Sequence, residues 1–493
     1  MPGAEPLSQI APEWTLQRRL WGHSFHPMCS YLGSFPASLA HAFIGRYSRP
    51  GDIVLDPFSG RGTTPLQACA EGRIGVGNDL HPLAALLTAA KLDPPARWDA
   101  SARLQLLRID WSRRADEWLE RAIGFDAPPL VASLFHPRTL AQLLFLRQAL
   151  NTGSRTDRFL MASLAGILHG RSDGYLTPLL PNTFSPPPGY VATFVGSSGA
   201  RPPERDVFSR LERKLVRLYR QPPPQARGIG LSGDARTAGS RARIQLRRRA
   251  LPDRARLVVT SPPYLRVLRY DQHNWLRSWL VGDGGMGHRG SVSVAGGATD
   301  DQLAPAEYAV FMRAVLADLR HVLATDAVVV LVLGEVARDR GRSRGAIGAL
   351  ADLVWHEAAE PEGYELAGCL TDPVQERRKM TGLWGPERGR ATTVDRLLVI
   401  APTEIGRRRA LADAGRPVDW AWPPPSALNP SWGASAGARP LGILARDAPA
   451  LSPPRPRGDG PVSPDEKSRP RADDQPPTQL RLAAAGSPVH PRG

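Results

Sequence analysis

The feature that most constrains the fold of this chain is a series of short, largely apolar runs separated by longer segments. The runs lie at residues 53–56, 74–79, 256–260, 327–333 and 396–400. Such runs, flanked by turn residues, are typical of strands buried on both faces of a sheet. From Tyr308 to Val322 apolar side chains recur at three- and four-residue steps, which predicts one buried face of a helix. Strands that alternate with helices predict an α/β fold with a parallel sheet covered on both faces.

Composition divides the chain into four parts. Residues 1–95 and 226–401 contain the strand-like runs and are expected to form one sheet domain. In residues 96–225 leucine and tryptophan recur at helical spacing, which predicts a mostly helical insertion. Residues 402–493 are rich in proline and arginine and lack a strand-like apolar run, so we expect a disordered tail.

Cysteine content and hydropathy exclude several classes of protein. The 493-residue chain has three cysteines, too few and too scattered for a disulfide framework, and no Cys/His cluster of the kind that binds structural zinc. It has no apolar run of membrane-spanning length and no signal-peptide pattern at its start. We therefore expect a soluble, cytoplasmic protein with no membrane partner and no bound metal.

The charge of the chain favours an anionic partner but does not establish one. Lysine and arginine number 63 against 47 aspartate and glutamate, a net charge of +16. An excess of this kind is typical of proteins that bind nucleic acid. However, only four of these cations are lysines, and a chain rich in arginine, alanine, glycine and proline can also reflect a GC-rich genome. Charge alone leaves both interpretations open.

The first chemically informative motif is Asp-Pro-Phe-Ser-Gly-Arg-Gly-Thr-Thr at residues 56–64, between a strand and a helix. Open parallel sheets bind ligands at the carboxyl ends of their strands, and Gly60 and Gly62 would let a ligand approach the backbone closely. Asp79 ends the next strand, where a carboxylate can accept hydrogen bonds from ribose hydroxyls. The alternative is a glycine-rich surface turn with a helix-capping aspartate, but the combined arrangement favours a nucleoside-containing ligand.

The second motif, Thr-Ser-Pro-Pro-Tyr at residues 260–264, follows another strand. Its two prolines remove backbone donors and restrict the chain, so the Ser261 hydroxyl and the Pro262 carbonyl can both accept hydrogen bonds from one exocyclic amine. Tyr264 offers a face on which a planar base can stack. This arrangement suits methyl transfer to an aryl amine by positioning and electrostatics rather than by covalent catalysis. The structural alternative is a proline-rich turn after a core strand.

Together the two motifs resemble those of the DNA amino-methyltransferases, enzymes that methylate the exocyclic amine of cytosine or adenine. Weaker similarities to this family occur at His26-Pro27, Phe35-Pro36, residues 47–52 and Gly233-Asp234-Ala235. Residues 168–184 resemble a segment of some bacterial relatives. The resemblance covers about residues 20–401. It implies a Rossmann-like class I methyltransferase sheet, S-adenosylmethionine as cofactor, and double-stranded DNA with a flipped target base as substrate.

The resemblance also implies roles for individual residues. The cofactor-binding residues would be Asp56, Phe58, Gly60, Gly62, Thr63, Asp79 and Asp234. The catalytic loop would consist of Ser261, Pro262, Pro263 and Tyr264. In this family serine at the first position of the loop is associated with cytosine, which implies N4-methylcytosine as the product. Two departures from the family are Arg61, where a small residue is usual, and the order of the motifs, which is reversed in many relatives.

Several alternatives remain open. An adenine-N6 methyltransferase, an RNA guanine methyltransferase and a non-catalytic DNA-binding scaffold each share part of the pattern. Candidates for target recognition are residues 96–225 and the loop from Arg266 to Thr299, although Trp275 and Trp279 of that loop could instead pack into the core. A restriction nuclease is a candidate partner. The sequence predicts neither the recognition site nor the oligomeric state.

Overall fold

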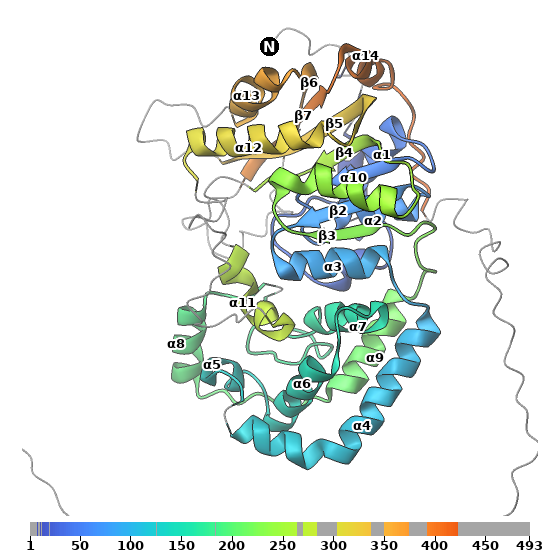
Figure 1. Cartoon of the computed structure of the whole chain (residues 1–493). Coiled ribbons are helices and arrows are strands. Elements are labelled where there is room, and N and C mark those ends of the chain that lie inside the picture. Colours follow the sequence, from blue (N-terminus) through green and yellow to red (C-terminus); the bar gives the residue numbers. More distant parts are fainter. Residues whose placement is uncertain are drawn as a thin grey trace, which may run out of the picture. The chain divides into compact units, whose positions relative to one another are not determined.

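A seven-stranded mixed sheet carries the fold (Figure 1). The computed structural model describes residues 7–422, apart from residues 8, 9, 11, 19, 125 and 183 and the segments 264–269, 283–302, 337–349 and 374–391. The strands follow the spatial order β3-β2-β1-β4-β5-β7-β6. Strand β7 runs antiparallel to both of its neighbours, while the other neighbouring pairs are parallel. The predicted Rossmann-like α/β sheet flanked by helices is thereby confirmed, but the expectation of a parallel sheet is wrong for the run at 396–400, because β7 pairs antiparallel with both β5 and β6.

Most strands coincide with the apolar runs of the sequence. Their bounds are β1 (Ile53–Asp56), β2 (Ile74–Asp79), β3 (Ile229–Ser232), β4 (Ala255–Thr260), β5 (Leu323–Val336), β6 (Glu365–Pro373) and β7 (Thr392–Ala401). Strands β5 and β7 are longer than predicted because their antiparallel pairing continues past the apolar residues, through Gly334 opposite Asp395. Strands β3 and β6 form the two edges of the sheet, and neither is a continuous apolar run.

Helices cover both faces of the sheet. On one face α1 (Ala37–Tyr47) and α14 (Glu404–Ala412) contribute to a core shared with β4, β5 and β7. On the other face lie α10 (Ala238–Arg248), α12 (Pro305–Leu319) and α13 (Leu350–Val354). Helix α12 buries the apolar series that the sequence predicted, from Tyr308 through Leu319. Helix α2 (Thr63–Ala70) packs against β1 and β2, and α3 (Pro82–Leu92) packs against β2 and β3.

The segment between α3 and β3 is built mainly from helices. They are α4 (Arg97–Ile123), α5 (Pro129–Ala132), α6 (Pro137–Ala149), α7 (Arg155–Ala165), α8 (Pro188–Ser198) and α9 (Val207–Leu218). Helix α11 (Tyr270–Val281) packs into their core with Trp275 and Trp279 buried, so the packing alternative holds for these two tryptophans. Among the described helices, including the 27-residue α4, none is apolar enough over its length to cross a membrane.

The ordered chain extends further toward the carboxyl side than predicted. The prediction of disorder from residue 402 is wrong for α14, which the Thr403 hydroxyl caps by accepting the Gly406 amide (3.3 Å). Ala410 of this helix is fully buried, and the Asp419 carbonyl is hydrogen-bonded to His41 Nε2 of α1 (2.8 Å). The helix packs against the sheet through small side chains such as this alanine. The arginine-rich composition of the segment therefore showed no apolar pattern from which a helix could be predicted. Residues 423–493 of the predicted tail lie outside the described part of the chain.

Candidate functional site

Strands β1 and β4 bring the two sequence motifs together. They are parallel neighbours in the middle of the sheet, so their carboxyl ends, Asp56 and Thr260, lie side by side at the same end of the strands. The Thr260 hydroxyl donates a hydrogen bond to Asp56 Oδ1 (2.6 Å), and the Thr64 hydroxyl donates one to the Val259 carbonyl (3.0 Å). The glycine-rich loop and the Thr-Ser-Pro-Pro loop are therefore joined directly where they leave the sheet.

Backbone conformation and crowding require glycine in the first loop. Gly62 has a φ of +76°, and a Cβ at this position would lie 2.9 Å from the Thr88 hydroxyl and 3.1 Å from Thr88 Cα. Gly60 has a φ of +51°, and its Cβ position faces the ring of Tyr31 at 3.6 Å. The Gly60 amide donates to Asp79 Oδ2 (2.8 Å). The loop is thus held in a left-handed turn between an aromatic ring and a carboxylate.

Asp79 retains hydrogen-bonding capacity for a ligand. Its Oδ2 accepts the Gly60 amide, and its Oδ1 accepts the His81 amide (2.9 Å). A carboxylate can accept about four hydrogen bonds in total, so further donors can bind. Burial raises the pKa of the Asp79 carboxyl to about 6, against the opposing effect of the backbone hydrogen bonds. A carboxylate with such capacity at the end of β2 suits the hydroxyls of a ribose.

Asp56, by contrast, directs its carboxylate into the protein. The residue is only 2% exposed, and Oδ1 accepts both the Thr260 hydroxyl and the Phe58 amide (3.1 Å). Burial raises the pKa of Asp56 to about 7, and these two hydrogen bonds act in the opposite direction. Asp56 therefore links the two loops, and it can influence a ligand only through the geometry of the loops.

Phe58 and Thr63 lie toward the two ends of the first loop. The ring of Phe58 is partly buried and packs against Phe311 of α12, with 5.9 Å between the ring centroids. Thr63 begins α2, is 3% exposed, and accepts a hydrogen bond from Arg61 Nε (3.3 Å). Arg61, the departure from the family pattern, thus contacts its own loop through its side chain.

Asp234 lies near Asp79 but is already paired. The Gly233 amide donates to the Asp79 carbonyl (2.9 Å), which places the end of β3 beside the end of β2. Asp234 Oδ2 accepts Arg236 Nη2 (2.5 Å), and Oδ1 accepts the Arg236 amide (2.8 Å). The guanidinium beside it also lowers the pKa of the Asp234 carboxyl. Asp234 therefore has less acceptor capacity for a cofactor than Asp79.

The second loop supplies three described residues at this end of the strands. Ser261 and Pro263 are partly exposed and Pro262 is buried. They directly follow Thr260, whose side chain is bonded to Asp56. Ser261 and Pro262 therefore leave β4 immediately beside the loop that contains Gly60 and Gly62. Tyr264, the fourth predicted residue, lies outside the described residues.

Asn78 supports the site and was missed by the sequence reasoning. The side chain is fully buried, and Nδ2 donates to the Pro57 carbonyl (3.1 Å) and to the Gly233 carbonyl (2.9 Å). Its Oδ1 accepts Arg241 Nη2 (2.6 Å). One amide side chain thus connects the loops after β1 and β3. Its position beside Asp79 in the sequence was the only signal, because its partners are far away along the chain.

Two polar side chains of α3 also hold the glycine-rich loop. The Thr88 hydroxyl donates to the Gly60 carbonyl (3.3 Å), and Lys91 Nζ donates to the Arg61 carbonyl (2.6 Å). Lys91 is completely buried, and this burial lowers the pKa of its ammonium group well below the usual value. A threonine and a lysine three residues apart in an otherwise apolar helix could have indicated these contacts.

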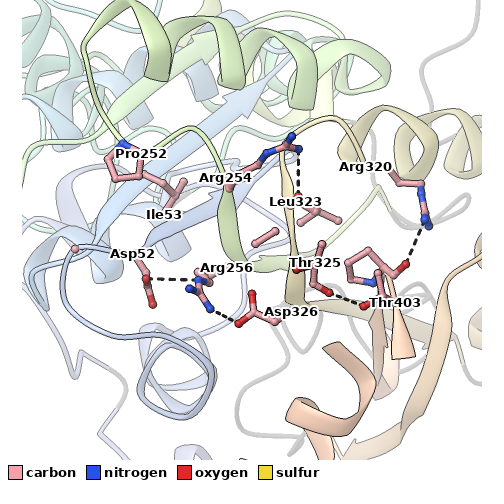
Figure 2. A pocket seen from close by; sticks show the side chains of 13 residues that line it. Asp52, Ile53, Pro252, Arg254, Arg256, Arg320, Leu323, Thr325, Asp326 and Thr403 are labelled. Atoms are coloured by element: carbon pink, nitrogen blue, oxygen red, sulfur yellow. Dashed lines mark hydrogen bonds and ion pairs between the residues drawn. The ribbon is translucent and has the colours of Figure 1, made fainter. Parts of the chain in front are cut away.

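A cavity of about 660 Å³ lies at the amino ends of the strands, on the side of the sheet opposite the two motifs (Figure 2). It is lined by the amino ends of β1, β4 and β5, including Ile53, Arg256 and Asp326. Arg256 is paired with Asp326, and Arg320 at the rim donates to the Pro402 carbonyl (3.2 Å). None of the predicted site residues that the structure describes lines this cavity. It is therefore separate from the two motifs.

Comparison with known proteins identifies relatives of parts of this chain. The model of the DNA methylase family matches residues 17–89. Type II methyltransferase M.MjaII of Methanocaldococcus jannaschii is 39% identical over 104 residues, which cover 21% of this chain and 18% of that protein. Type II methyltransferase M.XycI of Xanthomonas campestris pv. cyanopsidis is 36% identical over 77 residues, 15% of this chain and 26% of that protein.

The matched regions span about a fifth to a quarter of these relatives' lengths. The family model over residues 17–89 and these partial matches confirm the resemblance to the DNA amino-methyltransferases. Among solved structures, the rRNA methyltransferase aviRa of Streptomyces viridochromogenes matches with a TM-score of 0.29 and 12% identity, covering 82% of this chain and 96% of that one. TrmN of Thermus thermophilus matches with a TM-score of 0.27 and 12% identity, covering 76% and 52%.

Proposed function

We propose that this chain is an S-adenosylmethionine-dependent DNA methyltransferase that methylates the exocyclic amine of cytosine to give N4-methylcytosine. The observation that carries the proposal is the hydrogen bond between Thr260 and Asp56. It joins the glycine-rich loop, for which we propose cofactor binding, to the Thr-Ser-Pro-Pro loop, for which we propose binding of the acceptor amine. The relationship of residues 17–89 to DNA methylases supports the reaction class. The serine at position 261 supports cytosine over adenine.

The glycine-rich edge has the chemistry to hold S-adenosylmethionine. Asp79 accepts the ribose hydroxyls, while Gly60 and Gly62 let the cofactor approach the backbone without a Cβ in the way. Phe58, Thr63 and Asp56 shape this loop, and Asp234 is the weakest of the cofactor contacts because Arg236 already pairs with it. When bound, the cofactor supplies an electrophilic methyl group on a sulfonium.

The second loop holds the acceptor amine. The Ser261 hydroxyl and the Pro262 carbonyl accept the two amine hydrogens, and Pro263 keeps this stretch of chain rigid. Holding both hydrogens would favour a pyramidal nitrogen with its lone pair localised for attack. Methyl transfer would then break the methyl–sulfonium bond, release the thioether product and lose one amine proton to solvent. The protein therefore accelerates transfer by orientation and electrostatics, without a covalent intermediate. Tyr264 is proposed as the stacking partner of the flipped base.

Double-stranded DNA is the proposed partner, with the target base flipped out and a restriction nuclease as a candidate second partner. The net charge of +16 supports binding to the phosphate backbone. We therefore expect that raising the salt concentration from 50 to 200 mM weakens DNA binding on the order of tenfold or more, because phosphate contacts release counterions. Fluorescence anisotropy with a labelled duplex measures this dependence, and an affinity that does not change with salt would count against a phosphate-led interface.

Lowering the pH from 7 to 5 is expected to weaken binding of S-adenosylmethionine about tenfold. The raised pKa of Asp79, about 6, means that its carboxyl is mostly ionised at pH 7 and mostly protonated at pH 5, where it loses acceptor capacity. Asp79→Asn cannot titrate and should bind weakly with little dependence on pH. Calorimetric titrations of both proteins at each pH provide the comparison, and an equal pH dependence in both would refute the role of Asp79.

Mass spectrometry of nucleosides tests the proposed reaction. The purified chain is incubated with unmethylated genomic DNA, or with total RNA, and with S-adenosylmethionine carrying a deuterated methyl group. We expect labelled N4-methylcytosine from the DNA. Labelled N6-methyladenine would support DNA amine methylation but would show that adenine, not cytosine, is the target base. Label found only in RNA would make the protein an RNA methyltransferase. Absence of label from both would favour a non-catalytic scaffold.

A further inference from the structure

A turn at residues 171–175, between α7 and α8, is surrounded by arginines. Its backbone is closed by the Tyr175 amide, which donates to the Ser172 carbonyl (3.2 Å), and by the Gly170 amide, which donates to the Thr177 carbonyl (3.2 Å). A Cβ at Gly170 would lie 2.6 Å from the ring of Tyr175, so the ring packs directly on the glycine backbone. The turn therefore has a defined conformation that side chains around it can use.

Two largely buried arginines hold the turn. Arg205 Nη1 donates to the Tyr175 carbonyl (2.5 Å), and Arg210 Nε donates to the Asp173 carbonyl (2.9 Å). Arg210 Nη2 also donates to Asp173 Oδ1 (2.9 Å). The two arginine side chains are only 12% and 10% exposed. Burial and the neighbouring Arg210 guanidinium lower the pKa of Arg205, because two like charges are held close together.

Three further arginines beside the turn are exposed. Arg213 and Arg217 follow Arg210 on α9 at helical spacing, so the three lie on one face of the helix. The side chain of Arg213 is 58% exposed, and Arg217 Nη1 lies 3.5 Å from the Cβ position of Gly174. Arg171 belongs to the turn itself. Within the described part of the chain, neither Arg217 nor Arg171 has a hydrogen-bonding or ionic partner.

These five side chains form an arginine patch that is poorly neutralised. The patch consists of Arg171, Arg205, Arg210, Arg213 and Arg217. Among the described residues, Asp173 is the only carboxylate paired with any of them, and their charges lower its pKa. Glu204 and Glu212 pair instead with arginines of α6 and α4, and Asp206 caps α9. Five guanidiniums therefore share one carboxylate.

We propose that the arginine patch binds the phosphate backbone of duplex DNA. Guanidinium groups form paired hydrogen bonds with phosphate oxygens, and phosphates supply the negative charge that one carboxylate cannot. Asp173 and Arg213 are 70% and 58% exposed, so the patch is open surface, which suits an extended polymer better than a small anion. Contacts of this kind position a protein on DNA without reading its sequence. This inference rests on the proposed function and names a surface for its DNA partner.

Helix α9 also connects the patch to the proposed cofactor site. Lys214, buried next to Arg213 in the sequence, donates through Nζ to the Pro27 carbonyl (3.0 Å). The preceding carbonyl, of His26, lies 3.5 Å from Lys91 Nζ, which also donates to the Arg61 carbonyl of the glycine-rich loop (2.6 Å). The patch therefore belongs to the part of the helical insertion that packs against the proposed cofactor site.

Substitution of the two exposed arginines of α9 tests the proposal. We expect Arg213→Gln combined with Arg217→Gln to weaken binding of a labelled duplex on the order of tenfold at about 100 mM salt, measured by fluorescence anisotropy. The slope of log Kd against log salt concentration should fall by about two, because two phosphate contacts are lost. Arg213→Lys combined with Arg217→Lys keeps both charges and should retain most of the slope.

A matched control removes the same charge elsewhere. Arg113 of α4 and Arg248 of α10 are exposed and have no partner within the described residues. Arg113→Gln combined with Arg248→Gln should leave the slope close to that of wild type. The Kd for S-adenosylmethionine should stay within about twofold in every variant, because none of these side chains contacts the glycine-rich loop.

An unchanged slope in the Arg213→Gln, Arg217→Gln protein, or an equal fall in the control, would overturn the proposal. So would a parallel loss of cofactor affinity, or tighter binding of the wild-type protein to duplex RNA of the same sequence than to DNA. A wild-type protein that binds no duplex DNA would overturn it as well. If the wild-type protein binds DNA through the patch but transfers no methyl group, the proposed function fails and the assignment of this surface stands.

Discussion

Replacing Asp79 with alanine is expected to weaken binding of S-adenosylmethionine by about 2–3 kcal/mol, which corresponds to roughly 30- to 150-fold in Kd. The substitution removes charged acceptors for the ribose hydroxyls and also the acceptor of the Gly60 amide, which holds the glycine-rich loop. Isothermal titration calorimetry with S-adenosylmethionine measures the change. Asp79→Asn keeps one acceptor oxygen and should lose less affinity than Asp79→Ala.

Asp52→Ala provides the matched control. Asp52 lines the cavity at the amino ends of the strands, so its removal should leave cofactor affinity unchanged. An unchanged Kd in Asp79→Ala would refute the ribose assignment. Weaker cofactor binding in Asp52→Ala, together with unchanged binding in Asp79→Ala, would place the cofactor at the amino ends of the strands, away from the two motifs.

Ser261→Ala is expected to lower kcat on the order of a hundredfold while the Kd for S-adenosylmethionine stays within about twofold. The hydroxyl acts on the acceptor amine and not on the cofactor, so its loss raises the barrier of the transfer step and spares cofactor binding. Single-turnover methylation of a duplex with saturating cofactor gives the rate, and calorimetry gives the affinity.

Ser261→Thr retains the hydroxyl and should keep more of the rate than Ser261→Ala, because the acceptor oxygen remains at the end of β4. Full activity in Ser261→Ala would show that the catalytic loop is misassigned. A large loss of cofactor affinity in Ser261→Ala, without loss of folding, would instead place Ser261 in the cofactor site.

Much of the fold could be predicted because parallel strands buried on both faces leave continuous apolar runs in the sequence. Runs 53–56 and 256–260 correspond to β1 and β4 to within one residue. Edge strands such as β6 bury less and pair with one neighbour, so the same signal is absent there. Helix α14 was missed because its contact with the sheet rests on small side chains such as Ala410.

The location of the site could be predicted, but several of its side-chain roles could not. Two motifs that each follow a parallel strand must lie at the same edge of the sheet, so the meeting of the two loops followed from topology alone. The inward orientation of Asp56 depends on its hydrogen bond with the Thr260 hydroxyl of the neighbouring strand, a partner about 200 residues away that local sequence does not reveal. The pairing of Asp234 with Arg236 likewise depends on backbone geometry after β3.

A crystal structure of the protein with S-adenosylhomocysteine would show whether the two loops form one active site. We expect the ribose hydroxyls to lie within about 2.6–3.2 Å of the Asp79 carboxylate, with the sulfur directed toward Ser261. If S-adenosylhomocysteine bound instead in the cavity beside Ile53 and Asp326, at the amino ends of the strands, the proposed cofactor site would be wrong.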